Sequence, residues 1–254
     1  MPPIMILTED GSKQGFDTLR ALTREIVRVL DPLANRSVVK ITPPSDRAAQ
    51  LGAQATRWKS TSPRDRVHQV ALRSEIASQL QQGHYVFLHV DGDRAWADRA
   101  TSENRAKLDA FVTRPVANLL RGPRRRGGTP PSEEEAASML RKLVFLVPFY
   151  SIEAWTYQNL AAARRICVEQ HDGQHLEVFA RWSDDRGLLD EIGKVKEECC
   201  LRDQHNAELA ADHFPTREVV EVGKSFAACI DEIRERAPCL LAALASTHPT
   251  TPQK

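Results

Sequence analysis

The sequence predicts an α/β protein, with a parallel sheet of about four strands flanked by helices and a mostly helical C-terminal part. Four short apolar runs, at residues 4–7, 38–41, 86–90 and 143–147, have the composition and the bounding turn formers of buried strands. Stretches with apolar residues at helical spacing lie between them. This alternation favours parallel strands joined by helical crossovers.

Between the first and third strands the sequence predicts two helices and an irregular segment. Residues 16–30 place apolar side chains on one helical face, and an Asp-Pro pair ends that helix. A second amphipathic helix follows further on, with Val67 and Val70 on its apolar face. The proline-punctuated stretch 45–65 predicts a long loop or a broken helix, in which Trp58 either belongs to a basic flap or packs back onto the core.

Beyond the third strand, residues 108–119 have helical spacing, and Pro115 is expected to kink or split that helix. Residues 121–131 are rich in glycine, proline and arginine and therefore predict a linker. The next helix begins at Ser132, whose spacing to Glu135 is that of a capping box.

The fourth strand is followed by a helix start, at which Ser151 is expected to be the N-cap and Glu153 falls in the first turn. The helix dipole alone would favour a carboxylate there. Further along, the pattern is mostly helical. We therefore expect an α/β domain over residues 1–160, a helical extension over residues 161–245 and a disordered tail over residues 246–254.

Composition limits the classes of function. With 254 residues, 41% of them hydrophobic, the chain can bury a substantial core. A formal net charge of +1 argues against a generally basic nucleic-acid binder, so any such contact needs a local patch. Five cysteines without a C-x-x-C pair argue against a disulfide framework or a zinc knuckle. The short apolar start and the lack of a run of roughly 20 apolar residues predict a cytoplasmic protein without a signal peptide or membrane helix.

An acidic pair ends the third strand, where the apolar run stops at Asp91-Gly92-Asp93. Side chains two apart in extended backbone point the same way, so both carboxylates are expected to face one small volume. Two like charges so close require either a proton or a cation between them. Oxygen ligands suit a hard divalent ion, most plausibly Mg²⁺ or otherwise Mn²⁺. A plain hydrophilic Asp-Gly turn is the alternative.

Acidic residues also follow the first and fourth strands, Glu9 and Asp10 after the first and Glu153 after the fourth. The carboxyl ends of parallel strands meet at one edge of a sheet, which is where ligands bind in such folds. Either Glu9 or Asp10 could be the first-strand acid of a shared site, since Glu9 fits by residue type and Asp10, directly before a glycine, fits by spacing.

These motifs, with the segment Ile152-Glu153-Ala154-Trp155, resemble the TOPRIM domain of topoisomerases, primases and overcoming-lysogenization-defect (OLD) nucleases, and small bacterial TOPRIM-like proteins of the DUF4276 type. The resemblance covers roughly residues 4–160. It implies a Mg²⁺-dependent nuclease that hydrolyses phosphodiester bonds of DNA or RNA. Glu9 or Asp10, Asp91 and Asp93 would be the metal ligands. Glu153 would be a further catalytic residue that holds a second ion or supports the first.

Basic residues near these motifs are candidates for substrate binding. Lys13 and Arg94 each lie next to an acidic motif, and the linker contains Arg124, Arg125 and Arg126, which suit phosphate contacts. The resemblance further implies an ATPase partner and a role in bacterial defence against phage. The chain lacks a phosphate-binding loop of its own, so any use of ATP would have to come from such a partner.

Two other classes of function fit the same motifs. One is a non-catalytic TOPRIM-fold module that binds metal or nucleic acid, or regulates a partner, through the acidic site. The other is a metal-dependent phosphatase or nucleotidyl transferase. The sequence leaves open the strandedness of the substrate, the number of metal ions and whether the chain forms a homo-oligomer.

Overall fold

The chain folds around one parallel sheet. The structure, a computed structural model, describes residues 3–35, 39–93, 96, 100–122, 130–222 and 224–248. Within these residues the sheet has the strand order β2-β1-β3-β4, and every neighbouring pair is parallel. The strands are β1 (Ile4–Thr8), β2 (Ile41–Thr42), β3 (Tyr85–His89) and β4 (Leu143–Leu146). The expected parallel sheet with flanking helices and a helical C-terminal part is confirmed.

Helices connect the strands and make up the C-terminal part. Before β4 lie α1 (Lys13–Leu30), α2 (Arg47–Ala53), α3 (Ala55–Trp58), α4 (Arg66–Gln81), α5 (Glu103–Leu108), α6 (Arg114–Arg121) and α7 (Glu133–Leu140). After β4 follow α8 (Glu153–Thr156), α9 (Leu160–His171), α10 (Leu176–Asp184), α11 (Asn206–Ala211), α12 (Thr216–Glu221), α13 (Ser225–Arg236) and α14 (Pro238–Ala245). None of these described helices is long and apolar enough to cross a membrane.

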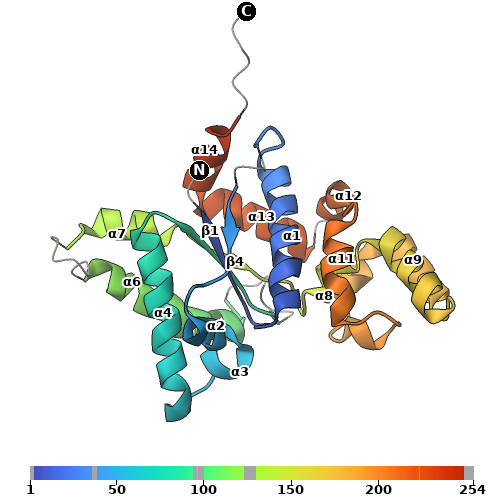
Figure 1. Cartoon of the computed structure of the whole chain (residues 1–254), viewed down its shortest axis with the longest axis horizontal. Coiled ribbons are helices and arrows are strands. Elements are labelled where there is room, and N and C mark those ends of the chain that lie inside the picture. Colours follow the sequence, from blue (N-terminus) through green and yellow to red (C-terminus); the bar gives the residue numbers. More distant parts are fainter. Residues whose placement is uncertain are drawn as a thin grey trace, which may run out of the picture.

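The sheet lies between two layers of helices. Alternate strand residues point to opposite faces, so each face buries its own apolar set. One face, with Ile6 and Phe87, packs against α1, α13 and α14. The other, with Leu7 and Leu88, packs against α4, α6 and α7. Figure 1 shows α4, α6 and α7 to the left of the sheet and α1 and α13 to its right.

A third apolar cluster lies in the C-terminal part, among residues from Tyr157 to Leu209, and it fully buries Phe179 and Trp182. Helix α9 at the far right of Figure 1 belongs to this lobe. The chain then returns to the sheet, because α12, α13 and α14 contribute to the same apolar cluster as α1. Helices α9 and α10 thus form a separate lobe, whereas α12, α13 and α14 pack on the sheet together with α1.

Several local expectations are confirmed. Ser132 and Glu135 form the capping box at the start of α7. Pro115 lies in the first turn of α6, directly after a π-helical turn at Asp109–Thr113, so the helix is interrupted by one widened turn. The segment 45–65 is a broken helix, and Trp58 is buried in the core.

Other local expectations are wrong. The second strand is reduced to the two residues of β2. Val67 and Val70 are 64% and 57% exposed, because α4 buries a different set of side chains, Leu72, Ile76 and Leu80 among them. Ser151 is not the N-cap of the helix after β4. That position belongs to Ile152, which makes no side-chain cap, and Glu153 begins α8.

Candidate functional site

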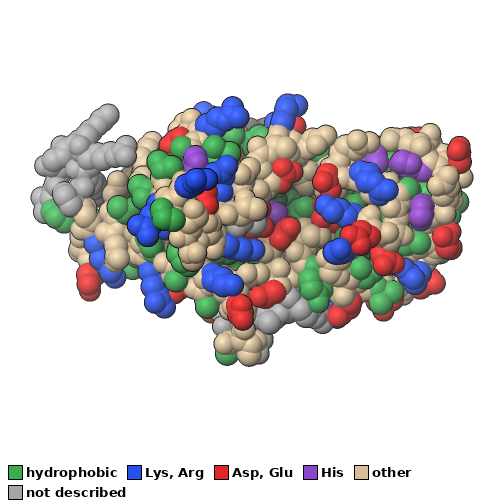
Figure 2. All heavy atoms as spheres, turned by 90° about the horizontal axis from the view of Figure 1, so that it is seen from below, with side chains coloured by type: hydrophobic (Ala, Val, Ile, Leu, Met, Phe, Trp, Pro, Cys, Tyr) green, Lys and Arg blue, Asp and Glu red, His purple; other side chains and the backbone are tan. Residues whose placement is uncertain are grey.

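The carboxyl ends of β1, β3 and β4 open into a cleft of about 320 Å³. Figure 2 looks onto this side of the molecule and shows acidic and basic side chains next to one another across its middle. The walls come from the strand ends, from the loop before α8 and from the C-terminal part. The polar and aromatic lining residues include Glu9, Asp10, His89, Asp91, Tyr150, Glu153, Lys194, Lys196, Asp203 and Asn206.

Glu9 ties the end of β1 to its neighbours. Its side chain is only 7% exposed. Trp58 donates a hydrogen bond from Nε1 to Oε1 (2.8 Å), and the backbone N–H of Asp91 donates to Oε2 (2.7 Å). The Lys59 Nζ lies 3.6 Å from Oε1. Burial, and next the charge of Asp91, raise the pKa of the Glu9 carboxyl, while Lys59 opposes this shift. The ionised form of Glu9 is therefore held at a cost in free energy.

His89 and Asp91 leave two buried polar atoms without a hydrogen bond. His89 is 3% exposed, and its Nδ1 lies 3.3 Å from Thr8 Oγ1. Its Nε2 lies 3.3 Å from Asp91 Oδ1, which is an ion-pair distance without hydrogen-bond geometry, so neither atom has a hydrogen-bond partner among the described residues. Burial lowers the pKa of His89, but the carboxylates of Asp91, Glu9 and Glu153 outweigh it, and the net shift is upward. The two atoms therefore face each other as an ion pair and make no hydrogen bond to any other described group.

Asp93 does not line this cleft. Its carboxylate accepts hydrogen bonds from Ser102 Oγ (3.1 Å) and from the backbone N–H of Asn104 (3.4 Å), at the N-terminus of α5. This differs from the expectation that the two carboxylates face one volume. The reason is that β3 ends at His89, so the alternation of extended backbone does not continue to residue 93. Gly92 passes close to the exit of β4, where a Cβ would lie 2.6 Å from a backbone oxygen.

Asp10 lies at the cleft, but its carboxylate turns toward the start of α1. Ser12 donates from its backbone N–H to Oδ1 and from its Oγ to Oδ2, both at 2.9 Å. Gly15 makes room for this arrangement, because a Cβ there would lie 2.7 Å from Asp10 Oδ2. Of the two first-strand acids, Glu9 is thus the one that bonds to the loop after β3.

Glu153 lies in the first turn of α8, as expected, and is 6% exposed. Asn206 of α11 donates from Nδ2 to its Oε1 (2.9 Å). Thr156 Oγ1 donates to Asn206 Oδ1 (3.2 Å), which fixes the orientation of the Asn206 amide. No described donor bonds to the second oxygen of Glu153. The C-terminal lobe therefore orients Glu153 and leaves one of its oxygens unengaged.

Two lysines of the C-terminal part complete the cleft, and the sequence did not single them out. Lys196 Nζ lies 3.2 Å from Asp203 Oδ1, whereas Lys194 pairs with a neighbouring glutamate. Burial of Lys196 opposes its charge, but Asp203, Glu153 and Asp91 outweigh this and raise its pKa. Lys196 is thus an ammonium group that faces the acids of the sheet. A glycine and two lysines that interrupt the helical pattern near residue 193 are the only sequence signal for this segment.

Of the basic residues expected to bind substrate, the structure describes Lys13, which does not line the cleft. Lys13 is on the surface of α1, with 90% of its side chain exposed and its Nζ 3.4 Å from Asp17 Oδ2. Arg94 and the linker residues Arg124, Arg125 and Arg126 lie outside the described residues.

The donor set of the cleft suits a hard divalent ion. Asp91 Oδ1 is buried without a hydrogen bond, and Glu153 has an unengaged oxygen. Each Glu9 oxygen accepts one hydrogen bond and retains a further lone pair. Among the described residues no three acidic, histidine or cysteine side chains are arranged around one point as a metal site. Asp91, Glu153 and Glu9 are the acids of the cleft that could contribute oxygen ligands to such an ion, and Mg²⁺ usually takes its remaining ligands from water and substrate.

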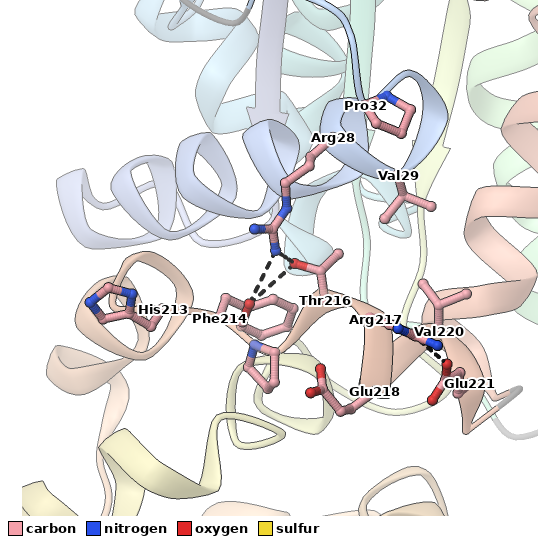
Figure 3. A pocket seen from close by; sticks show the side chains of 11 residues that line it. Arg28, Val29, Pro32, His213, Phe214, Thr216, Arg217, Glu218, Val220 and Glu221 are labelled. Carbon is pink, nitrogen blue, oxygen red and sulfur yellow. Dashed lines mark hydrogen bonds and ion pairs between the residues drawn. The ribbon is translucent and has the colours of Figure 1, made fainter.

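A larger cavity, of about 680 Å³, lies elsewhere, between α1 and α12. Figure 3 shows Arg28 pointing to Thr216 and to the carbonyl of Phe214, which both accept hydrogen bonds from its Nη2. Arg217 pairs with Glu221 at 2.8 Å. The Arg28 contacts join α1 to the start of α12, whereas the Arg217–Glu221 pair lies within α12. The acids that follow the strands of the sheet line the smaller cleft and not this cavity.

Comparison with family models, with curated proteins and with solved structures finds no match to this chain. The α/β architecture follows from the coordinates alone. The TOPRIM resemblance stays a prediction from the motifs, and the geometry of the cleft carries the argument about function.

Proposed function

We propose that the protein is a metal-dependent nuclease that hydrolyses phosphodiester bonds in this cleft. The observation that supports the proposal best is that one cavity is lined by Asp91, which follows β3, by Glu153 at the start of α8 and by Lys196 from the C-terminal lobe. Carboxylate oxygens suit a divalent cation, and an ammonium group suits a phosphate. The combination fits the binding of a phosphodiester together with an ion.

Each residue has a role that follows from its surroundings. Asp91 offers the buried oxygen that lacks a hydrogen bond, and Glu153 offers the oxygen that Asn206 leaves free. Glu9 holds the backbone of Asp91 in place. Lys196 would contact the scissile phosphate and offset the negative charge that develops there. A bound Mg²⁺ would supply Lewis-acid activation of the phosphate.

The proposal is tested with purified wild type and two aspartate variants on labelled single-stranded and duplex DNA and RNA, in Mg²⁺ or Mn²⁺. Asp91→Asn should abolish cleavage, because it removes the charge of a carboxylate that lines the cleft and would bind the ion. Asp93→Asn is the matched control and should retain cleavage, because Asp93 bonds to α5 instead. Activity that survives Asp91→Asn, or that disappears equally in both variants, would contradict the proposed site.

A second candidate function is a non-catalytic binding or regulatory module. Two observations favour it: Asp93 is diverted to a helix end, and both Glu9 oxygens already accept hydrogen bonds. This candidate predicts that the wild type cleaves no DNA or RNA with any metal, alone or with a partner ATPase.

The setting of the activity is also part of the proposal. The resemblance to OLD nucleases supports a cytoplasmic bacterial protein that acts against phage with an ATPase partner. Co-expression with a candidate ATPase tests this point: co-purification of the two chains is expected, and activity that is unchanged by the ATPase and by ATP would argue against it.

A further inference from the structure

Tyr150 is an aromatic side chain at the cleft whose ring and hydroxyl are both unengaged. It is half-buried in the loop between β4 and α8, three residues before Glu153. Among the described residues its hydroxyl makes no hydrogen bond, and no aromatic ring or cation stacks on its ring. Gly193 lies beside one edge of this ring, where a Cβ would be 3.8 Å from Tyr150 Cδ1. At this point of the C-terminal segment the chain has no side chain, so Gly193 leaves the edge of the ring uncovered by a side chain of its own.

The size and the charges of the cleft limit what can lie against that ring. About 320 Å³ is at the small end of the roughly 300–1,000 Å³ found for ligand pockets, which suits one nucleotide rather than a base pair. Lys194 and Lys196 line the same cavity and can bind a phosphate. His89, only 3% exposed, also lines the cleft, and its Nε2 makes no hydrogen bond although it lies 3.3 Å from Asp91 Oδ1. A buried polar atom without a hydrogen bond calls for a further partner, which a ligand of the cleft would supply.

We propose that the cleft accepts one unpaired nucleotide of a single-stranded polynucleotide, with its base stacked on Tyr150 and its phosphate beside Lys196. This inference rests on the proposed nuclease function and adds the class of substrate. Stacking on an aromatic side chain tolerates every base, so the site selects single strands without selecting a sequence. A fully paired nucleotide would have to leave its duplex before it could enter.

The test measures binding in an Asp91→Asn background, so that no substrate is consumed. Fluorescence anisotropy compares labelled single-stranded DNA, single-stranded RNA and blunt duplex DNA of one sequence. Both single strands should bind more tightly than the duplex. Adding Tyr150→Leu should weaken single-strand binding by about 5- to 150-fold, the equivalent of losing one stacked base, whereas Tyr150→Phe keeps the ring and should bind within about twofold of the parent. Thermal unfolding of each variant establishes that it is folded.

The outcomes separate this inference from the proposed function. Equal affinity for single strand and duplex, no binding of either single strand, or a Tyr150→Leu variant that binds like its parent would overturn the nucleotide site. If the wild type cleaves in Mg²⁺ but is indifferent to Tyr150→Leu and to strandedness, only this inference fails. If single strands bind through Tyr150 but no metal supports cleavage by the wild type, only the nuclease function fails.

Discussion

Replacing Glu9 by glutamine should change how the stability of the metal-free protein depends on pH. Burial and the Asp91 charge raise the folded-state pKa of Glu9 above its ordinary value of 4.5. An acid with a raised pKa contributes stability that is fully present below the unfolded-state pKa and is lost as pH rises through the folded-state pKa. The wild type should therefore lose about 1.4 kcal/mol for each pH unit by which the folded-state pKa exceeds 4.5. Glu9→Gln cannot ionise and should not show this loss.

The measurement is the free energy of unfolding from urea denaturation, at a series of pH values from about 4 to 8 and without divalent metal. As pH rises above 4.5, the free energy of unfolding of the wild type should fall relative to that of Glu9→Gln. Glu169→Gln, at an exposed position of α9, is the matched control and should give a constant difference. A wild type that gains stability over Glu9→Gln between pH 4.5 and neutrality would refute the reasoning, because it would mean that the cleft favours the ionised form.

Two further predictions follow from described contacts, and a third follows from the arginine-rich linker in the sequence. Trp58→Phe removes the hydrogen bond to Glu9 Oε1 and should destabilise the protein by about 1–3 kcal/mol in urea denaturation; an unchanged midpoint would show that the bond adds nothing. Lys196→Met should weaken single-strand binding and make the slope of log binding constant against log salt concentration shallower by the equivalent of about one phosphate contact. Lys13→Met, on the surface of α1, should leave the affinity and this slope unchanged. Replacing arginines 124–126 by alanine should weaken binding equally for all sequences and flatten its salt dependence, and unchanged affinity at low salt would make the segment a plain linker.

The sheet was predictable because its signals are local. Each strand is a short apolar run with turn formers at its ends, and Glu9, Asp91 and Glu153 each follow such a run within six residues. Strand ends in a parallel sheet share one edge, so the meeting of these acids could be inferred without coordinates. The strand order β2-β1-β3-β4 was not inferred, because it depends on packing between distant segments.

The errors at the site arose where distant contacts decide the local structure. Asp93 was expected beside Asp91, but β3 ends at His89 and the start of α5 supplies the donors that hold Asp93. Lys196 and Asn206 were missed, because the contact between Asn206 and Glu153 joins residues 53 apart in a stretch without strand or motif signals. Periodicity identifies helices there but does not say which of them returns to the sheet.

Binding of Mn²⁺ by the metal-free protein near neutral pH tests the central claim most directly, because it needs no assumption about substrate. Isothermal titration calorimetry of the wild type should show a bound ion. Loss of a residue that only supports a metal ligand costs roughly 10- to 100-fold in metal affinity. Asp91→Asn removes a proposed ligand itself and should weaken Mn²⁺ binding by at least as much. Asp93→Asn should bind as the wild type does, because its carboxylate bonds to α5. A wild type that binds no ion, or an Asp93→Asn variant as impaired as Asp91→Asn, would contradict the assignment of this cleft as the metal-dependent site.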